Sequence, residues 1–441
     1  MAALITLCYN LLLRPLGLLL LYGPGLLVVR IRRNLFARHG DLRRLRRELA
    51  KRPLPESSAD RPRVWLHCAS MGEYEGIRPL ASALKARGCV TILSFFSISG
   101  MHNLKPDHGF DQVCFLPLDG WFAVRALVRT LRPDVFVVTK HDLWWNLLRR
   151  LSREGCALLF INANYHNRAH FDRRLLRGFY RSLLGRFDGI HPVNALAERR
   201  FRALLAGTPA AERVSALGET RFDRVLERMR AASGAEMLPA QFASGSTVLV
   251  AGSTWPRDEA VLLPAVARAR EQYPDLRLLL VPHEPSVSHL DQSTALCQRL
   301  GLSVLRLAEF EAGTPYTNQP VFLIDRIGLL AGLYRVGQLA WVGGGFTTGV
   351  HSVIEPAAYA IPVIFGPAHH VSQEASRLLA AGGAFEVAEE SRLRQLFDLM
   401  LGEPSRRLHH GRAALKVVEQ STGATTRILE RILACGKAGP C

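Results

Sequence analysis

Short apolar runs alternate with stretches of helical periodicity along most of the chain. Largely apolar runs occur at 64–68, 90–94 and 135–139, each followed by turn or polar residues. Between the runs, apolar residues return every three or four positions, as at 74–87 and 121–131. This alternation is typical of βαβ units, in which crossover helices join parallel strands. The pattern therefore predicts an α/β fold with parallel sheets.

The alternation occurs in two sets, which indicates two doubly wound domains. The expected strands of the first set are 64–68, 90–94, 113–116, 135–139, 158–161, 189–192 and 215–217, and those of the second are 247–251, 277–281, 304–307, 321–324, 339–342 and 361–365. A helix and a looser Ala/Ser/Gly segment at 224–245 separate the sets. We therefore expect Rossmann-like domains at 62–235 and 246–405, followed by a C-terminal helix at 406–441.

Residues 1–52 form a separate segment that is apolar first and basic afterwards. Residues 1–29 are largely apolar, but Arg14-Pro15 and Gly23-Pro24-Gly25 interrupt them. A spanning helix needs about 20 consecutive apolar residues, and no small-residue cleavage site indicates a signal peptide. An apolar segment with a basic flank is typical of a membrane anchor on the cytoplasmic side, either spanning or interfacial. The alternative is an N-terminal helix that packs on the protein.

Composition narrows the class of protein. Hydrophobic residues make up 48% and charged residues 21% of the 441 residues, as in a globular chain of two domains. The net charge of +18 favours a nucleic acid, an anionic lipid or a phosphorylated substrate as partner. Basic residues concentrate at 30–63 and at 168–186, where the spacing indicates a basic amphipathic helix or a solvated helix face. The 8 cysteines include no CxxC pair, which favours a reducing compartment.

A glycine-rich loop within 341–367 is the clearest candidate binding site. An apolar strand runs into the glycines at 343–345, and a short loop leads to a helix that we expect to begin near Ser352. Glycines let the backbone approach a ligand closely, and a helix N-terminus offers free N–H groups to a phosphate. Glu355 lies one turn into this helix. The Glu355 carboxylate can accept hydrogen bonds from hydroxyl groups such as those of a ribose, or it can interact favourably with the helix dipole. The sequence does not favour one of these interpretations over the other.

Polar side chains follow the strands of the first domain, where open parallel sheets bind ligands beyond the carboxyl ends of their strands. Glu73 comes after the first strand and can act as a general base or as a helix-dipole glutamate. Lys140-His141-Asp142 comes after the fourth strand and can bind an anion or form surface salt bridges. The chain has no HExxH or GxxxxGK motif and no DxD-like pair at a strand end, so we expect no metal.

Taken in order, these segments resemble the 3-deoxy-D-manno-octulosonic-acid (Kdo) transferases, glycosyltransferases of lipid A and lipopolysaccharide assembly. The resemblance runs over nearly the whole chain. Its most specific segments are HCASMGEYEG at 67–76 and VGGGFTTGVHSVIEPAAYAIPVIFGP at 342–367. The weaker ones are KHDLWWN at 140–146, INANYHNR at 161–168, GETRFDRV at 218–225, AGSTWPRDE at 251–259, VPHEP at 281–285 and IDRIGLLAGLY at 324–334.

The resemblance implies a fold, a reaction and a location. Members of the family have two Rossmann-like domains facing a cleft, the GT-B arrangement, with the acceptor in the first domain and the donor CMP-Kdo in the second. They use no metal or other cofactor. Glu73 matches their catalytic base, which would deprotonate a hydroxyl of a lipid A precursor, lipid IVA. That hydroxyl would attack Kdo with inversion as CMP leaves. Residues 1–52 look like the family's anchor, which implies the cytoplasmic face of the cell inner membrane.

The same match implies the residues that line the two substrate sites. The donor site is expected to contain Ser253, Pro282, His283, Ile327, Gly328, Leu329, Gly344, Gly345, His351, Ser352, Val353, Ile354 and Glu355. The acceptor site is expected to contain Ser70, Gly72, Lys140 and Asn164. The chain departs from the family pattern at four places, which indicates a divergent branch or an altered donor or acceptor preference. Pro282-His283-Glu284 stands where many members have Pro-Arg-His, His351-Ser352 where many have His-Asn, Leu329-Leu330 where many have Glu-Leu, and Lys140-His141-Asp142 where a Glu is common.

Two other functions are compatible with the sequence. One is a GT-B glycosyltransferase that uses another nucleotide sugar. The other is a basic nucleic-acid-binding protein, which the charge favours, although the chain lacks interleaved exposed aromatic residues and a known reading helix. The resemblance implies CMP-Kdo, a lipid A precursor and an anionic membrane surface as partners, and no nucleic acid.

Overall fold

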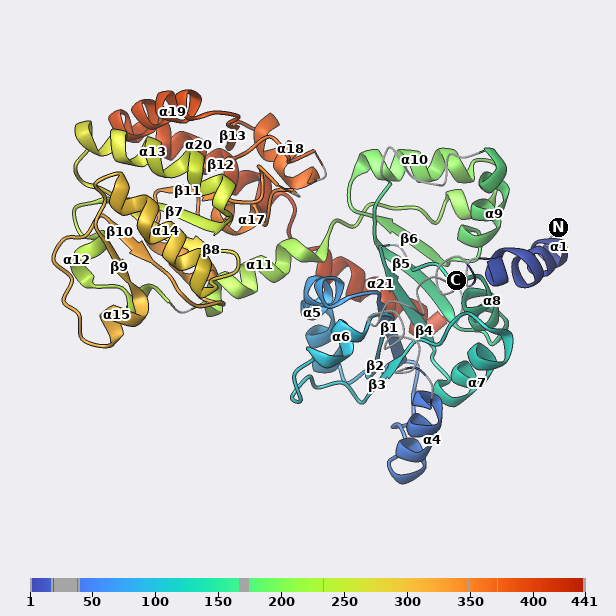
Figure 1. Cartoon of the computed structure of the whole chain (residues 1–441). Coiled ribbons are helices and arrows are strands. Elements are labelled where there is room, and N and C mark those ends of the chain that lie inside the picture. Colours follow the sequence, from blue (N-terminus) through green and yellow to red (C-terminus); the bar gives the residue numbers. More distant parts are fainter. Residues whose placement is uncertain are drawn as a thin grey trace. The chain divides into compact units, whose positions relative to one another are not determined.

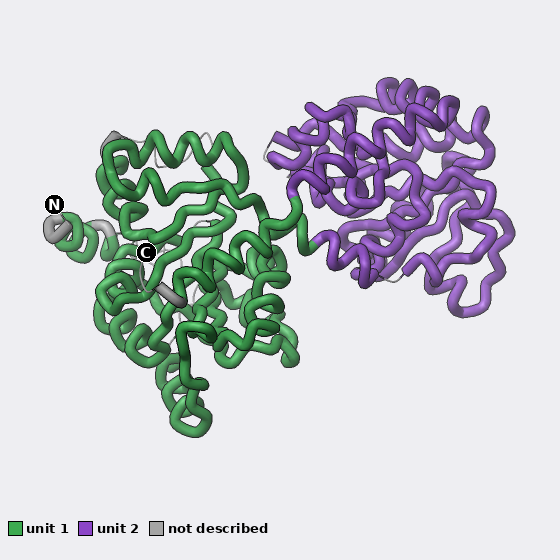
Figure 2. Tube along the Cα trace, turned by 180° about the vertical axis from the view of Figure 1, so that it is seen from behind, with its two compact units in different colours: residues 1–224, 422–441 green, residues 225–421 purple. Residues whose placement is uncertain are grey.

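The chain forms two compact units (Figure 2). The computed structural model describes residues 2–16, 19, 38, 40–140, 142–165, 174–232, 234–347, 349–370 and 372–438. Unit 1 consists of residues 1–224 and 422–441, and unit 2 consists of residues 225–421. The boundary lies within α11 Thr220–Ala231, at the start of the segment 224–245 that was expected to separate the two domains, and the end of the chain returns to unit 1.

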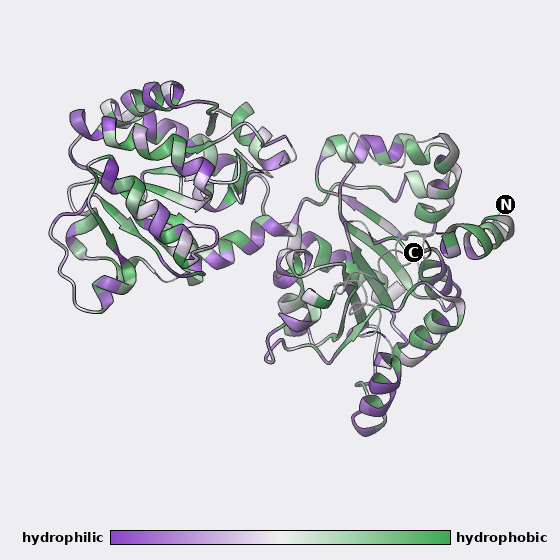
Figure 3. Ribbon diagram, viewed as in Figure 1, coloured by the Kyte–Doolittle hydropathy of each residue, from purple (hydrophilic) through white to green (hydrophobic). Residues whose placement is uncertain are grey.

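Unit 1 is built on a six-stranded parallel sheet with the order β3-β2-β1-β4-β5-β6 (Figure 1). Its strands are β1 Arg63–Cys68, β2 Val90–Phe95, β3 Gln112–Phe115, β4 Val135–Thr139, β5 Ala157–Ala163 and β6 Gly189–Pro192. Those in the middle are buried along nearly their whole length and consist mainly of hydrophobic residues (Figure 3). The order reverses between β1 and β4, which is where sheets of this kind bind ligands.

Helices cover both faces of this sheet, which is why its strands are apolar on both sides. One face packs against α5 Met71–Ala86 and α21 Ala424–Ala438. The other packs against α7 Trp121–Leu131, α8 Trp145–Arg153, α9 Arg174–Leu184 and α10 Ala195–Leu205. Two shorter helices, α4 Asp41–Lys51 and α6 Ile98–His102, lie near the β3 edge and at the end of β2 (Figure 1). The helix α9 carries the basic amphipathic pattern predicted within 168–186.

The end of the chain forms two helices where the sequence predicts one at 406–441. The first, α20 Pro404–Glu419, belongs to unit 2, and α21 belongs to unit 1. Gly423 lies between them with φ +80°, a left-handed conformation that glycine adopts without strain. Asp223 accepts hydrogen bonds from the backbone N–H groups of Gly423 and Thr425, at 2.6 and 2.7 Å. These bonds satisfy free donors at the start of α21.

The N-terminal helix packs on unit 1 through polar contacts. The helix α1 Ala2–Cys8 continues into the π-helical turn Tyr9–Leu13. The Tyr9 hydroxyl donates to Asp119 Oδ2 at 2.9 Å. Asn10 and Asn146 exchange hydrogen bonds of 2.8 and 3.1 Å. This part of the expected anchor therefore packs on the protein, as the alternative interpretation of the sequence has it.

The same helix also exposes leucine side chains. Leu7, Leu11, Leu12 and Leu16 are between 52% and 65% exposed. Among the described residues, no helix is long and apolar enough to cross a membrane. Most of the remaining expected anchor, 20–37, lies outside the described residues.

Unit 2 is built on a seven-stranded parallel sheet with the order β13-β12-β11-β7-β8-β10-β9. Its strands are β7 Thr247–Thr254, β8 Leu276–Pro282, β9 Val304–Arg306, β10 Val321–Leu323, β11 Leu339–Val342, β12 Val363–Phe365 and β13 Ala384–Glu386. Its other helices are α12 Ala240–Ala243, α13 Pro256–Gln272, α14 Val287–Arg299, α15 Leu307–Glu311, α16 Leu330–Leu333, α17 Ile354–Ala358, α18 Gln373–Ala380 and α19 Glu390–Gly402. The strand order reverses between β7 and β11, which places a second ligand position there.

Two expected elements differ in the structure, and one strand was not expected. The segment 215–217 forms no strand, and only an isolated bridge joins Val214 to Ile190. The helix expected from Ser352 is the five-residue α17, because the chain turns at Ala360 with φ +57°. The strand β13 is not predicted, since its three residues include a glutamate and form no apolar run.

Glycines let the backbone of the loop after β11 pass very close to the backbone at the ends of β7 and β12. A Cβ atom on Gly343 would lie 2.1 Å from the carbonyl oxygen of Ser253, at the end of β7. A Cβ atom on Gly345 would lie 2.4 Å from the backbone nitrogen of Gly366, after β12. Backbone atoms cannot give way as the tip of a side chain can. The glycines therefore hold three strand ends together.

We predict that Gly343→Ala lowers the stability of the protein by about 1–3 kcal/mol, because the added methyl group overlaps the Ser253 carbonyl. The matched control is Gly178→Ala on α9, where no atom lies within 4 Å of the new Cβ. That change should raise stability by about 0.5–1 kcal/mol, since alanine favours the helix. Thermal denaturation measures both variants. Equal melting temperatures would contradict the prediction.

Candidate active site

Glu73 lies in the first turn of α5, directly beyond the end of β1. Its Oε2 atom accepts a hydrogen bond of 2.6 Å from the backbone N–H of Ala69. Its Oε1 atom has no hydrogen-bond partner among the described residues. One oxygen is thus fixed by the backbone, while the other is available to a ligand.

The surroundings of Glu73 make it a stronger base than a glutamate in water. Burial raises the pKa of Glu73 above its ordinary value of 4.5, and the nearby Asp142 carboxylate raises it further. The hydrogen bond from the Ala69 N–H lowers this pKa by less than burial raises it, but by more than Asp142 does, and the charges of Lys140 and His67 lower it by the smallest amounts. A carboxylate whose pKa rises toward neutral pH is better matched to general-base catalysis.

A chain of hydrogen bonds positions Asp142 beside Glu73. The indole N–H of Trp65 donates to Ser94 Oγ at 2.7 Å, and Ser94 Oγ lies 2.8 Å from His67 Nδ1. Because Ser94 Oγ accepts the hydrogen bond from Trp65, the hydroxyl proton of Ser94 can be donated to His67 Nδ1. His67 then carries its proton on Nε2, which lies 3.2 Å from Asp142 Oδ2. No local pattern in the sequence indicates a role for His67 or Ser94, since both lie within apolar strands.

The ends of β4 and β5 are held in strained conformations. Lys140 and Asn162 have φ of +62° and +50°, in the left-handed region that non-glycine residues rarely adopt. Lys140 Nζ lies 3.8 Å from Glu219 Oε1. The Asn162 side chain donates to Thr220 Oγ1 at 3.0 Å and accepts from its N–H at 3.1 Å. These contacts fix polar residues at the ends of β4, which lies beside β1, and of β5, which lies beside β4.

The structure places the other predicted acceptor residues at the same edge. Ser70 is the N-cap of α5 and its carbonyl accepts from the Tyr74 N–H. Gly72 is exposed in the first helical turn, and Asn164 follows β5. His141 of the predicted triplet lies outside the described residues.

In unit 2, three aromatic rings meet beyond the ends of β7, β8 and β11. The Trp255 indole N–H donates to His351 Nε2 at 3.0 Å, so a neutral His351 carries its proton on Nδ1. The His283 and His351 rings stack with centroids 4.1 Å apart. Burial and the neighbouring His283 lower the pKa of His351. The structure thus brings together His283 and His351, two residues predicted to bind the donor substrate. Trp255, which contacts both, was not among the predicted residues.

Asp258 fixes the glycine loop to the start of α13. Its Oδ2 atom accepts hydrogen bonds from the Gly344 N–H at 2.9 Å and from the Trp255 N–H at 3.0 Å. Gly344 has φ +89°, and the His351 N–H donates to the carbonyl of Gly343. The backbone of the predicted donor loop is therefore held by a side chain from another element.

Glu355 forms an ion pair inside unit 2. Its Oε1 atom lies 2.9 Å from Arg228 Nη1, and the residue is 9% exposed. The charge of Arg228 offsets the cost of burying the Glu355 carboxylate. No local pattern in the sequence indicates this pair. The predicted contact of Glu355 with a ribose stays a prediction.

The remaining predicted donor residues differ in exposure. Ser253 has φ +55° at the end of β7, beside Gly343. Pro282, Val353, Ile354 and Gly345 are buried, whereas Ser352 and Leu329 are half-buried. Ile327 is 81% exposed after β10, and Gly328 beside it has φ +100°. In the described part of the chain, no three His, Cys, Asp or Glu side chains gather as metal ligands would.

Comparisons with known proteins agree with the motifs. Residues 40–224 match the sequence model of the family described as 3-deoxy-D-manno-octulosonic-acid transferase (kdotransferase). The 3-deoxy-D-manno-octulosonic acid transferase of Chlamydia trachomatis serovar A is 25% identical over 397 residues, which cover 87% of this chain and 89% of that protein. The transferase of Haemophilus influenzae is 25% identical over 439 residues, which cover 97% of this chain and 96% of that protein.

A solved structure shares the fold. The UDP-GlcNAc 2-epimerase from Neisseria meningitidis bound to UDP-GlcNAc aligns with a TM-score of 0.60 and 12% identity, over 84% of this chain and 100% of that chain. Both units are parallel-sheet α/β domains, as predicted. The resemblance to the Kdo transferases is confirmed by the sequence comparisons, and the chain is related to them over most of its length.

The raised pKa of Glu73 predicts a pH-dependent stability difference. A carboxyl whose pKa is raised in the folded state stabilises the fold below its unfolded pKa, and this contribution is lost as pH rises through the folded value. Glu73→Gln removes the titration. The melting temperature of the variant relative to the parent should therefore rise between about pH 4 and pH 8. Glu56→Gln, at an exposed glutamate, is the control. A difference for Glu73→Gln that is constant over this range would refute the assignment.

Proposed function

We propose that this chain, a relative of the Kdo transferases, is an inverting glycosyltransferase that moves Kdo from CMP-Kdo to a lipid A precursor in lipopolysaccharide biosynthesis. Lipid IVA is the acceptor we propose. The relationship along most of the chain supports the reaction. The observation that carries the mechanism is the half-buried Glu73, with one oxygen fixed and the other available.

Glu73 acts as the general base. Its Oε1 atom accepts the proton of an acceptor hydroxyl, and the hydroxyl oxygen forms a bond to the anomeric carbon of Kdo. The bond from that carbon to the phosphate oxygen of CMP breaks, and its electron pair leaves with the phosphate. Attack from the opposite side inverts the anomeric centre. Burial, and to a smaller extent the Asp142 carboxylate that His67 positions, keeps the pKa of Glu73 raised.

The residues of unit 2 stabilise the leaving phosphate. His351 presents Nδ1–H as a donor, because Trp255 occupies its other ring nitrogen. The backbone around Gly344, which Asp258 fixes, provides a close approach for the phosphate oxygens. CMP has a single phosphate, and neutral histidines with backbone N–H groups suit it, so we infer that no metal takes part. The ion-paired Glu355 accepts hydrogen bonds from the ribose hydroxyls.

The GT-B arrangement is part of this proposal. Unit 1 holds the acceptor and the base, and unit 2 holds the donor. Two parallel α/β domains, each with a strand-order reversal and polar residues beyond it, support this division.

We also propose that unit 1 binds the cytoplasmic face of the cell inner membrane. Leu7, Leu11, Leu12 and Leu16 are exposed on the N-terminal helix, which Tyr9 and Asn10 hold against the rest of unit 1. Asn10 contacts Asn146, which shares a small surface hollow with Arg125, Arg149, Arg150 and Arg153. Apolar side chains beside arginines suit an interfacial helix on anionic lipid.

Purified protein with CMP-Kdo and a tetraacylated lipid A precursor tests the reaction, with product mass counted in Kdo increments. We predict that Glu73→Gln lowers turnover by about 10²–10⁴-fold, because amide oxygen is a very weak base. Glu56→Gln should keep the parental rate. Near-normal turnover by folded Glu73→Gln would remove Glu73 from the mechanism. Turnover with a UDP-sugar and none with CMP-Kdo would favour the alternative glycosyltransferase.

Membrane association has its own test. We predict that Leu11→Ser/Leu12→Ser lowers co-sedimentation with vesicles containing anionic phospholipid, because burial of two leucines contributes about 1.5–3 kcal/mol each. The control is Leu196→Ser, at a leucine on α10 that is also 51% exposed. Raised salt should weaken binding of the parent, since arginines contribute. Equal binding of both variants would exclude this face.

A further inference from the structure

Six arginines gather at the surface of unit 1, and the proposed reaction uses none of them. The arginine cluster consists of Arg125 and Arg129 on α7, Arg149, Arg150 and Arg153 on α8, and Arg186 after α9. The helices α7 and α8 lie side by side (Figure 1). Side chains from both helices line a small hollow: Trp121, Val124, Arg125, Asn146, Arg149, Arg150 and Arg153. The remaining two arginines, Arg129 and Arg186, lie near arginines of the hollow.

The positive charge of the arginine cluster has almost no counterpart in the described part of unit 1. Arg150 forms an ion pair with Glu154. The side chains of the other five arginines form no hydrogen bond or ion pair with any described residue. The Nε atoms of Arg150 and Arg186 are buried and lack a hydrogen-bond partner there. Burial, and then the charges of neighbouring arginines, lower the pKa of both guanidinium groups. Such crowded charges and unpartnered donors are stabilised when an anion binds.

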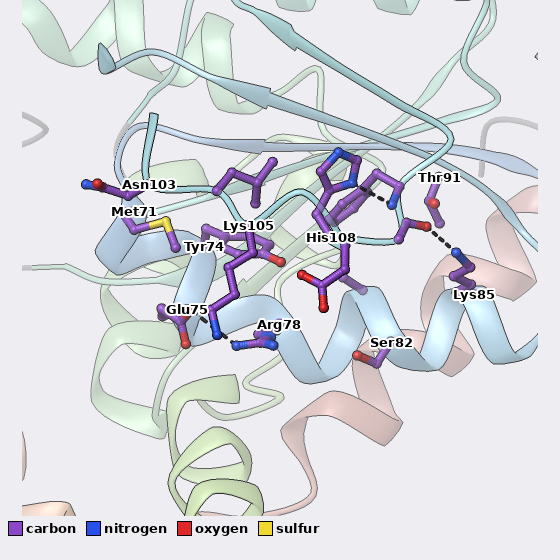
Figure 4. A pocket seen from close by; sticks show the side chains of 15 residues that line it. Met71, Tyr74, Glu75, Arg78, Ser82, Lys85, Thr91, Asn103, Lys105 and His108 are labelled. Atoms are coloured by element: carbon purple, nitrogen blue, oxygen red, sulfur yellow. Dashed lines mark hydrogen bonds and ion pairs between the residues drawn. The ribbon is translucent and has the colours of Figure 1, made fainter. Parts of the chain in front are cut away.

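A larger cavity in unit 1 has a different pattern of charge. It has a volume of about 200 Å³ and lies between α5 and the segment 103–110 (Figure 4). Its lining carries the carboxylates of Glu75 and Asp107 as well as cations. Glu75 lies 2.9 Å from Arg224 and 3.5 Å from Arg78. That cavity therefore supplies charges of both signs, whereas no described acidic residue lines the hollow at the arginine cluster.

Exposed apolar side chains border the arginine cluster. Trp121 is 42% exposed, and the Arg149 guanidinium carbon lies 5.3 Å from the centre of its ring. Phe122, the next residue, is 83% exposed. Asn146 of the hollow contacts Asn10 on the N-terminal helix, which exposes four leucines. A ligand that matches this surface is anionic at one end and apolar at the other.

We propose that the arginine cluster is a binding site for the phosphate of an anionic phospholipid headgroup. Each guanidinium presents planar pairs of N–H donors that match two phosphate oxygens. The hollow has a volume of about 20 Å³, room for roughly one oxygen atom, so the rest of the headgroup stays at the surface. Trp121 and Phe122 then lie beside the start of the acyl chains.

The inference rests on the proposed membrane contact for the source of the phosphate, and it adds a discrete site to that contact. Diffuse attraction to an anionic surface depends on charge alone, whereas a site also depends on donor geometry and saturates at a single headgroup. A nucleic acid also carries phosphates. The exposed leucines cannot stack on its bases, but they suit acyl chains, so the surface favours a lipid.

Titration calorimetry of the full chain with dihexanoyl phosphatidylglycerol, below its critical micelle concentration, tests the site without a bilayer. The parent should bind a single molecule per chain. Dihexanoylglycerol has the same chains but no phosphate, and the parent should bind it at least about tenfold more weakly.

Two variants of Arg149 and Arg153 distinguish a site from diffuse charge. Arg149→Gln/Arg153→Gln should lower the affinity for the short-chain lipid about 10–30-fold. Its melting temperature should not fall, because the change removes repulsion within the cluster. Arg149→Lys/Arg153→Lys keeps the charge but loses the planar donors, so it should also weaken binding. The control, Arg299→Gln/Arg394→Gln, makes the same charge change at exposed arginines of unit 2 and should bind as the parent does.

Equal affinity of the parent and the glutamine variant for the short-chain lipid would overturn the inference. Inorganic phosphate or duplex DNA that binds as tightly, with the same dependence on Arg149 and Arg153, would overturn it as well. The site and the membrane contact can fail separately. Arginine-dependent lipid binding by a protein that does not sediment with anionic vesicles would support the site and reject the membrane contact. Sedimentation that the glutamine variant retains, without binding of the short-chain lipid, would do the reverse.

Discussion

The parallel direction of every strand is the constraint on which both units depend. All the pairings of both sheets are parallel, so the carboxyl ends of neighbouring strands meet at one edge. Buried strands leave no room for polar side chains until they end. The residues of both candidate sites therefore lie in the turns that follow the strands: Glu73 after β1, Asp142 after β4, and the glycine loop after β11. The reversal of strand order keeps helices from covering these positions.

In unit 2, the start of α13 holds together the segments at the carboxyl-terminal edge of the sheet. Asp258 accepts hydrogen bonds from the glycine loop, while the next residue, Glu259, points into the core. Glu259 accepts from Thr254 at 2.7 Å, His289 at 3.0 Å and Ser293 at 2.6 Å. The hydrogen bond to Glu259 is the main reason that the pKa of His289 is raised. Two consecutive carboxylates thus join β7, α14 and the loop after β11 into one rigid support.

The sequence predicts the strands well and the side-chain partners poorly, for a physical reason. Apolar runs such as 135–139 reveal buried strands, because burial demands a continuous local pattern. The His67–Ser94–Asp142 chain joins residues from three separate elements, and no local pattern encodes it. The Arg228–Glu355 pair likewise joins positions far apart in sequence.

The contacts of the N-terminal segment also could not be predicted from a local sequence pattern. Its apolar composition predicts either an anchor or a packed helix, and the described part has features of both. Tyr9 and Asn10 provide polar contacts with the protein, while Leu11 and Leu12 remain exposed. A count of apolar residues cannot show which side chains of this segment contact the protein and which are exposed. That depends on where the hydrogen-bond partners Asp119 and Asn146 lie in the fold.

Two carboxylates in this chain show how a structural glutamate differs from the candidate base. Glu259 uses both oxygens in hydrogen bonds, so its charge is stabilised within the fold. Glu73 receives a single backbone hydrogen bond, and burial raises its pKa. A fold that needed Glu73 only for stability would gain from a second donor at Oε1, or from a neutral residue. The free oxygen lowers the stability of the unliganded protein, and in the proposed reaction an acceptor hydroxyl would give this oxygen a partner.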